Sequence, residues 1–193
     1  MEQIAPHEHS IGDLPIGNGP GKVPLSSSIR TGLIAVQSAN SGAVASTAAL
    51  TAFSGTGSYT LPANTLRANE VLRVSFLGTF GVTGTPTFLL SLSVGGVNRG
   101  ATNPLVVNAA GNWSVDLEIT QLASNAARMK AVFIIQSDTS IVGETVFYDV
   151  QGMDPTIDNI IVLSAQWGTS NPANTTTQVY RTVSREAIFN SAA

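Results

Sequence analysis

The strongest constraint on this fold is a strict alternation of apolar and polar residues in several short segments. Residues 113–120 give the clearest case, with Trp, Val, Leu and Ile at the odd positions and Ser, Asp, Glu and Thr at the even positions. Successive side chains of a β-strand point to opposite faces, so this pattern predicts a strand with one buried and one solvated face. Residues 72–80 and 87–94 alternate in a similar way.

Eight strands are expected along the chain, separated by turns rich in Gly, Asn, Asp and Pro. They cover residues 58–61, 72–80, 87–94, 113–120, 128–137, 141–150, 158–167 and 175–189. A helix over residues 43–50 is an open alternative to strand, but no amphipathic helix separates the strands, which disfavours a parallel sheet. We therefore predict an all-β fold, an antiparallel β-sandwich of the jelly-roll type, with an up-and-down barrel as the alternative.

The chain divides into three parts. Residues 1–30 contain four of the nine prolines and several glycines, which predicts an extended N-terminal arm. Its aliphatic residues are expected to anchor the arm on another protein surface, and they are Ile4, Ile11, Leu14, Ile16, Val23, Leu25 and Ile29. Residues 31–56 form an uncharged connecting segment, for which the lack of charge predicts burial against protein. Residues 57–193 form the β-sandwich.

Composition excludes several classes of function. The 9 basic and 12 acidic residues give a net charge of −3, so the chain lacks the positive field that nucleic-acid binding requires. No apolar run is long enough to span a membrane. There is no cysteine, and the two histidines, His7 and His9, both lie in the arm, where we expect them to be solvated. We therefore expect neither an enzyme nor a bound cofactor or metal.

The acidic residues of the body are expected to have ordinary roles. Asp116 and Glu118 fall on the solvated face of their strand. A calcium site formed by Asp149, Asp154 and Asp158 is the alternative to turn formation, but their spacing matches no calcium-binding loop.

Two strands are apolar on both faces, which predicts self-association. Val132 and Ile134 lie between the predicted core residues of one strand, and Ile160 and Val162 do so in another. Such strands need a second covering layer, so we expect a homo-oligomer, a trimer, with these four residues at its interface. Trp113 is predicted to be a core residue.

Trp167 and Tyr180 lie near strand ends and are the candidates for exposed aromatic residues.

Two blocks of sequence resemble proteins of the tailed-bacteriophage virion surface. They are residues 157–167 followed by Asn-Thr-Thr-Thr at 174–177, and the histidine-containing block 7–14. The resemblance is to capsid decoration (cement) or head-fibre proteins with a jelly-roll body. It implies a structural protein made in the host cytoplasm and located on the capsid surface, where the arm clamps onto the major capsid protein. The alternative is a tail fibre or a receptor-binding protein that binds carbohydrate, although the chain contains neither the heptads nor the repeat of a fibre shaft.

Overall fold

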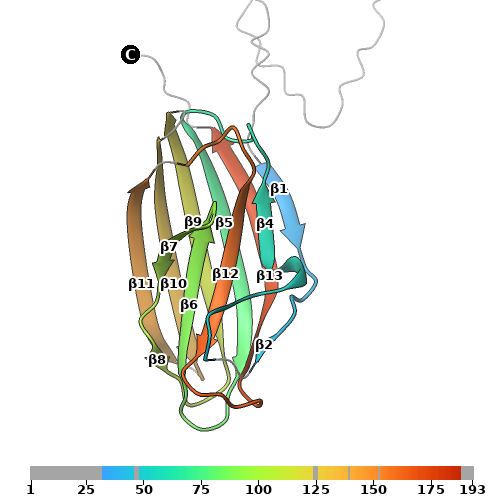
Figure 1. Ribbon diagram of the computed structural model, residues 1–193, viewed down its shortest axis with the longest axis vertical. Coiled ribbons are helices and arrows are strands. Elements are labelled where there is room, and N and C mark those ends of the chain that lie inside the picture. The colour runs from blue at the N-terminus through green and yellow to red at the C-terminus, as the bar shows by residue number, and fades with distance from the viewer. Residues whose placement is uncertain (1–31, 46–47, 124–125, 139, 152, 188–193) are drawn as a thin grey trace, which may run out of the picture.

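Two antiparallel β-sheets pack face to face in the computed structural model of the chain (Figure 1). The structure describes residues 32–45, 48–123, 126–138, 140–151 and 153–187. The chain passes repeatedly from one sheet to the other, and the expected all-β antiparallel sandwich is confirmed. No helix within the described ranges is long and apolar enough to cross a membrane.

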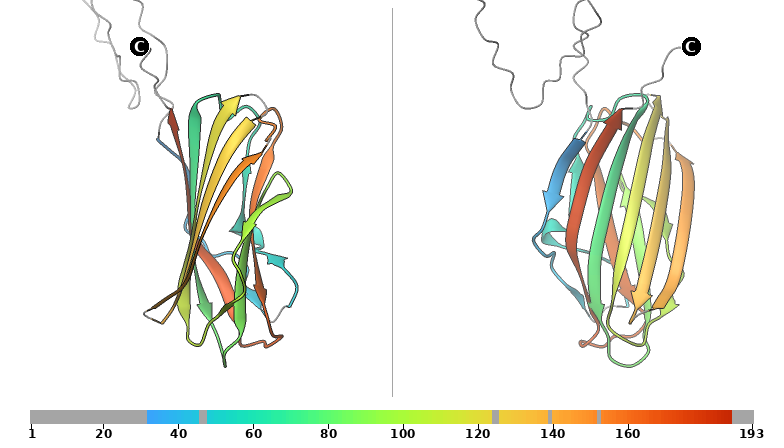
Figure 2. Two further views of the ribbon diagram at one scale, coloured as in Figure 1. Left: turned by 90° about the vertical axis from the view of Figure 1, so that its left-hand side faces the viewer. Right: turned by 180° about the vertical axis from the view of Figure 1, so that it is seen from behind.

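Sheet A contains the long strands. Its order is β1 (Gly32–Gln37), β13 (Thr175–Ala187), β5 (Glu70–Gly81), β9 (Gly111–Ala123), β10 (Ala126–Ser137) and β11 (Ser140–Gln151). The short strand β2 (Val44–Ala45) also pairs with β13. The right panel of Figure 2 shows this sheet from its solvent side, with β1 at one edge and β11 at the other.

Sheet B is smaller and covers the inner face of sheet A. Its order is β3 (Thr51–Ala52), β12 (Asn159–Trp167), β6 (Thr87–Val94) and β7 (Val97–Ala101). Two short strands complete it, β4 (Ser58–Leu61) on β12 and β8 (Leu105–Val106) on β6. In the described part of the chain, the short 3-10 helix η1 (Gly55–Gly57) is the only helical element.

The core lies between the two sheets and contains the apolar half of each alternating strand. Its largest fully buried side chains include Trp113, Trp167, Phe76, Phe88 and Phe133. The rings of Phe88 and Trp167 lie 4.7 Å apart between centroids, and those of Phe80 and Phe88 lie 5.2 Å apart. Such ring contacts add to the burial of apolar surface, which is the main contribution to the stability of a sandwich core.

The segment 31–56 is part of both sheets. It supplies β1 and β2 to sheet A and β3 to sheet B, so the chain joins the sandwich at Gly32, well before residue 57. No helix forms within the described part of residues 43–50, where β2 lies instead. The expectation that this uncharged segment is buried is wrong for much of it, because Leu33 is 64% exposed and Leu50 is 48% exposed. The predicted arm, residues 1–30, lies outside the described residues.

Candidate functional site

The solvent side of sheet A, called here the outer face, contains two neighbouring hollows. Both lie over the central strands β5, β9 and β10, where strand register sets which side chains stand side by side. Ser75, Asp116 and Val132 form one row across these strands. Leu77, Ser114 and Ile134 form the next row, two residues along each strand. The two hollows are therefore adjacent parts of one surface.

The first hollow, the charged hollow, has a volume of about 230 Å³. Its lining residues are Arg73, Ser75, Asp116, Leu117, Glu118, Lys130 and Val132. Arg73 lies between two carboxylates, with Nη2 at 3.5 Å from Glu118 Oε2 and 3.4 Å from Glu186 Oε2. The hydroxyl of Ser75 donates a hydrogen bond of 2.5 Å to Oδ1 of Asp116. These contacts fix the positions of carboxylate groups at a solvent-accessible surface.

The charged hollow and its rim carry an excess of negative charge. The carboxylates of Asp116, Glu118 and Glu186 outnumber the cations of Arg73 and Lys130. Lys130 is directly opposite Glu118 in the register of β9 and β10, and Arg73 is already bound to two acids. The hollow is therefore suited to a ligand that donates hydrogen bonds, and it is unsuited to an anion.

The second hollow, the amide hollow, has a volume of about 330 Å³ and mixes aliphatic and amide groups. Its lining residues are Leu77, Gly78, Thr79, Asn112, Trp113, Ser114, Ile134, Gln136 and Val179. An irregularity in the pairing of β13 with β5 falls between Gln178 and Tyr180, beside Val179. Leu77 is 43% exposed, so an apolar surface lies beside the amide side chains.

Gly78 and Trp113 form the floor of the amide hollow. They pair directly across β5 and β9, and a Cβ atom on Gly78 would lie 2.0 Å from Cζ2 of Trp113. The indole is buried, as predicted, and its Nε1 donates a 2.9 Å hydrogen bond to Oγ1 of Thr176. The outer face is therefore supported from within by a fixed aromatic ring.

The structure separates the residues predicted to form one oligomer interface. Val132 and Ile134 are half-buried on the outer face of sheet A and line the two hollows. Ile160 and Val162 point to the solvent side of sheet B, where Ile160 is 48% exposed, because the alternating residues Ile161 and Leu163 are in the core. The two pairs therefore lie on opposite sides of the sandwich.

The prediction that Trp167 is exposed is wrong. Trp167 is fully buried against Phe80 and Phe88, because it occupies an inward position of β12. Tyr180 is half-exposed and pairs with Leu77 beside the amide hollow.

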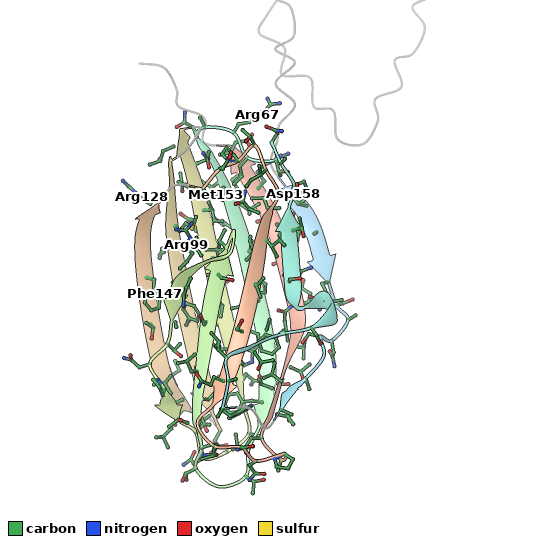
Figure 3. The ribbon with its side chains drawn as sticks, viewed as in Figure 1. Arg67, Arg99, Arg128, Phe147, Met153 and Asp158 are labelled. Atoms are coloured by element: carbon green, nitrogen blue, oxygen red, sulfur yellow. The ribbon has the colours of Figure 1, made fainter. Side chains whose placement is uncertain are left out.

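Asp154 and Asp158 both shape turns. Oδ1 of Asp154 accepts hydrogen bonds from the hydroxyl and the backbone N–H of Thr156, and these bonds lower the pKa of Asp154. Asp158, near the upper end of the sandwich in Figure 3, accepts a 2.8 Å bond from the N–H of Ala63. Among the residues whose side chains are described, no group of three His, Asp or Glu could hold a metal ion. His7 and His9 and the side chain of Asp149 lie outside the described residues.

A buried cation that sequence reasoning missed joins the two sheets at the β1 side. Arg181 on β13 donates from Nη1 to the carbonyl oxygens of Thr56, at 2.9 Å, and Ser58. Its guanidinium lies 5.3 Å from the ring centroid of Tyr59. Burial lowers the pKa of Arg181 and raises that of Tyr59. The sequence of residues 175–187 does not predict the burial of Arg181, because an arginine in a Thr-rich strand is expected to be solvated.

Comparisons with known proteins give little further information. No protein-family model matches the chain, and no curated protein matches it. One similar solved structure is the metal-free form of lectin I-B4 from Griffonia simplicifolia, with 8% identity, coverage of 70% of this chain and 79% of the lectin, and a TM-score of 0.30. Another is the CBM2 module of the evolved Dit protein of Lactobacillus casei BL23 phage J-1, with 9% identity, coverage of 66% and 67%, and a TM-score of 0.25. Scores this low carry no information on function.

Proposed function

We propose that this chain is a bacteriophage virion surface protein whose β-sandwich binds carbohydrate through the outer face of sheet A. The observation that carries the proposal is the pair of adjacent hollows, one lined by positioned carboxylates and the other by amides beside aliphatic side chains. The assignment to a virion is supported by the sequence resemblance of residues 7–14, 157–167 and 174–177.

The chemistry of the two hollows suits a sugar. A pyranose ring presents hydroxyl groups at its rim and C–H groups on its faces, so it needs both hydrogen-bonding groups and an apolar surface. Asp116 can accept hydrogen bonds from hydroxyls, and Gln136 can both donate and accept. Leu77 and Ile134 supply the apolar surface between them. Since Ser75 already holds Asp116, little side-chain freedom is lost on binding.

The two ends of the described chain support attachment from one end of the sandwich. Gly32, the first described residue, pairs with Arg185 near the end of β13, so both ends lie at the upper end in Figure 1. Gly32 stands two strands away from Leu72 in the same register row, so an arm that precedes it starts level with the Arg73 end of the charged hollow. Carbohydrate binding takes precedence over capsid decoration here, because the described residues form hollows for a ligand, whereas decoration rests on the arm and on the sequence resemblance.

Glycan binding by the full chain tests this function. We expect the protein to bind a neutral oligosaccharide on a glycan array, and the affinity of that oligosaccharide is then measured by calorimetry. Asp116→Asn should weaken binding about tenfold or more, because it replaces a charged hydrogen-bond acceptor with a neutral one.

The matched control is Thr60→Ala, an exposed position of β4 on the opposite sheet, which should bind like the unmodified protein. Absence of binding to any glycan of the array and to host surface polysaccharide would overturn the proposal. If Asp116→Asn binds glycan as tightly as the unmodified protein, the charged hollow is not part of the binding site.

A further inference from the structure

Strand β1 is an apolar edge of sheet A. Within the described chain it pairs with β13 on one side only and is the end strand of the sheet order. Leu33, Ile34 and Val36 are 64%, 39% and 50% exposed, so three large aliphatic side chains lie on one strand of six residues. The edge is held in place, because Gln37 Nε2 donates to Oγ1 of Thr56 at 2.9 Å and Oε1 of Gln37 accepts from Gln178.

This edge lacks the usual protection against pairing. Edge strands commonly carry charged residues or proline, which prevent another strand from adding to the sheet. Residues 32–37, Gly-Leu-Ile-Ala-Val-Gln, contain neither. The protective feature present is a bulge between Leu33 and Ala35, and the pairing is regular again from Ala35 to Gln37.

We infer that β1 pairs with β1 of a second copy of this chain, antiparallel and about a two-fold axis. Because the strand and all residues from 31 to 66 are uncharged, two copies meet there without like-charge repulsion. The opposite edge of sheet A is less suited to self-pairing, because β11 carries the exposed Glu144. A two-fold contact is also closed, so it does not lead to open filaments.

The sequence that precedes β1 is a poor alternative partner. Residues 15–24 of that sequence contain three prolines. Pro15, Pro20 and Pro24 would each remove a hydrogen-bond donor from an added strand. The β1 strand of a second copy contains no proline and keeps all its backbone hydrogen-bond donors.

The geometry of the pair has a consequence for the outer face. The two-fold axis of an antiparallel pair stands perpendicular to the sheet, so the two sheets A continue into one another and both outer faces point the same way. The hollows of both copies then face one side. If the carbohydrate function proposed above holds, the dimer binds two sites of one polysaccharide with an avidity that a single copy lacks.

Mass and cross-linking test the inference on the full chain. We expect sedimentation equilibrium at micromolar concentration to give a dimer. The double variant Leu33→Lys/Val36→Lys should be a monomer, and its affinity for itself should fall more than tenfold. The control Val106→Lys, at a residue of β8 that is 61% exposed, should remain a dimer. Fluorescence of the buried Trp113 and Trp167 reports whether each variant is folded.

The absence of natural cysteine permits a direct test of the geometry. Single cysteines at positions 33, 34, 35 and 36 are oxidised in turn, and only those near the two-fold axis should form an interchain disulfide, since the Cα atoms must come within about 7 Å. Val106→Cys should remain reduced between chains. A monomeric or trimeric protein would overturn the inference. So would a dimer that remains a dimer in the double variant and that no cysteine in β1 cross-links. These outcomes do not depend on glycan binding.

Discussion

At the residue scale, the contact between Gly78 and Trp113 limits what β5 can contain. A Cβ atom at Gly78 would lie 2.0 Å from the indole and 2.6 Å from the backbone oxygen of Thr177, and neither neighbour can move freely. We expect Gly78→Ala to lower the free energy of unfolding by about 1–3 kcal/mol or more, the usual cost of overpacking a core. Urea denaturation followed by tryptophan fluorescence measures this change.

The matched control for this prediction is Gly81→Ala in the same strand. There the added methyl group would meet only Oγ1 of Thr175, at 3.7 Å, an ordinary contact distance. This variant should change stability by less than about 0.5 kcal/mol, as substitutions away from such contacts usually do. Equal stability of the two variants would show that the Trp113 ring is not fixed against Gly78.

At the element scale, β13 joins the edges of the two sheets through Arg181. Its guanidinium satisfies the carbonyl oxygens of Thr56 and Ser58, at the junction of η1 and β4. Arg181→Met keeps the aliphatic stem but leaves both oxygens without this donor, which should cost about 1–3 kcal/mol of stability. Thermal unfolding followed by circular dichroism measures the loss.

Arg73→Met is the control for Arg181, because both substitutions remove one cation from sheet A. The Arg73 side chain is 52% exposed and its ion pairs are at the surface, so the loss should be below about 1 kcal/mol. A smaller loss for Arg181→Met than for Arg73→Met would contradict the role assigned to Arg181.

At the scale of the whole molecule, Gly32 divides the chain into two parts with different proposed functions. The arm before it attaches the protein to the virion, and the β-sandwich after it binds glycan. Since β1 begins there, a chain that lacks residues 1–31 should retain the sandwich and its strand-rich circular dichroism spectrum. We expect the truncated protein to bind glycan but no longer to co-sediment with virions that lack their own copy. Unchanged co-sedimentation would assign attachment to the β-sandwich instead of the arm.

The strands can be predicted from the amino-acid sequence. All eight predicted strands match β4, β5, β6, β9, β10, β11, β12 and β13 to within a few residues. Alternation is a local property of a strand with one buried face, so it can be recognised without knowledge of the neighbouring strands. The short strands β7 and β8, and the three in residues 31–56, were missed because they are too short or too uniform in polarity to alternate.

The pairing of strands, and with it the position of the hollows, follows from the folded chain and not from any one segment. Asp116 and Ser75 are each predictable as outward residues, but only the register of β5 with β9 brings them within hydrogen-bonding distance. The same holds for Trp167, whose strand continues the buried alternation to its last residue, and for β1, which is exposed because no described strand lies beyond it. A local pattern fixes which face of a strand is buried, but the choice of neighbouring strand depends on the packing of the whole chain.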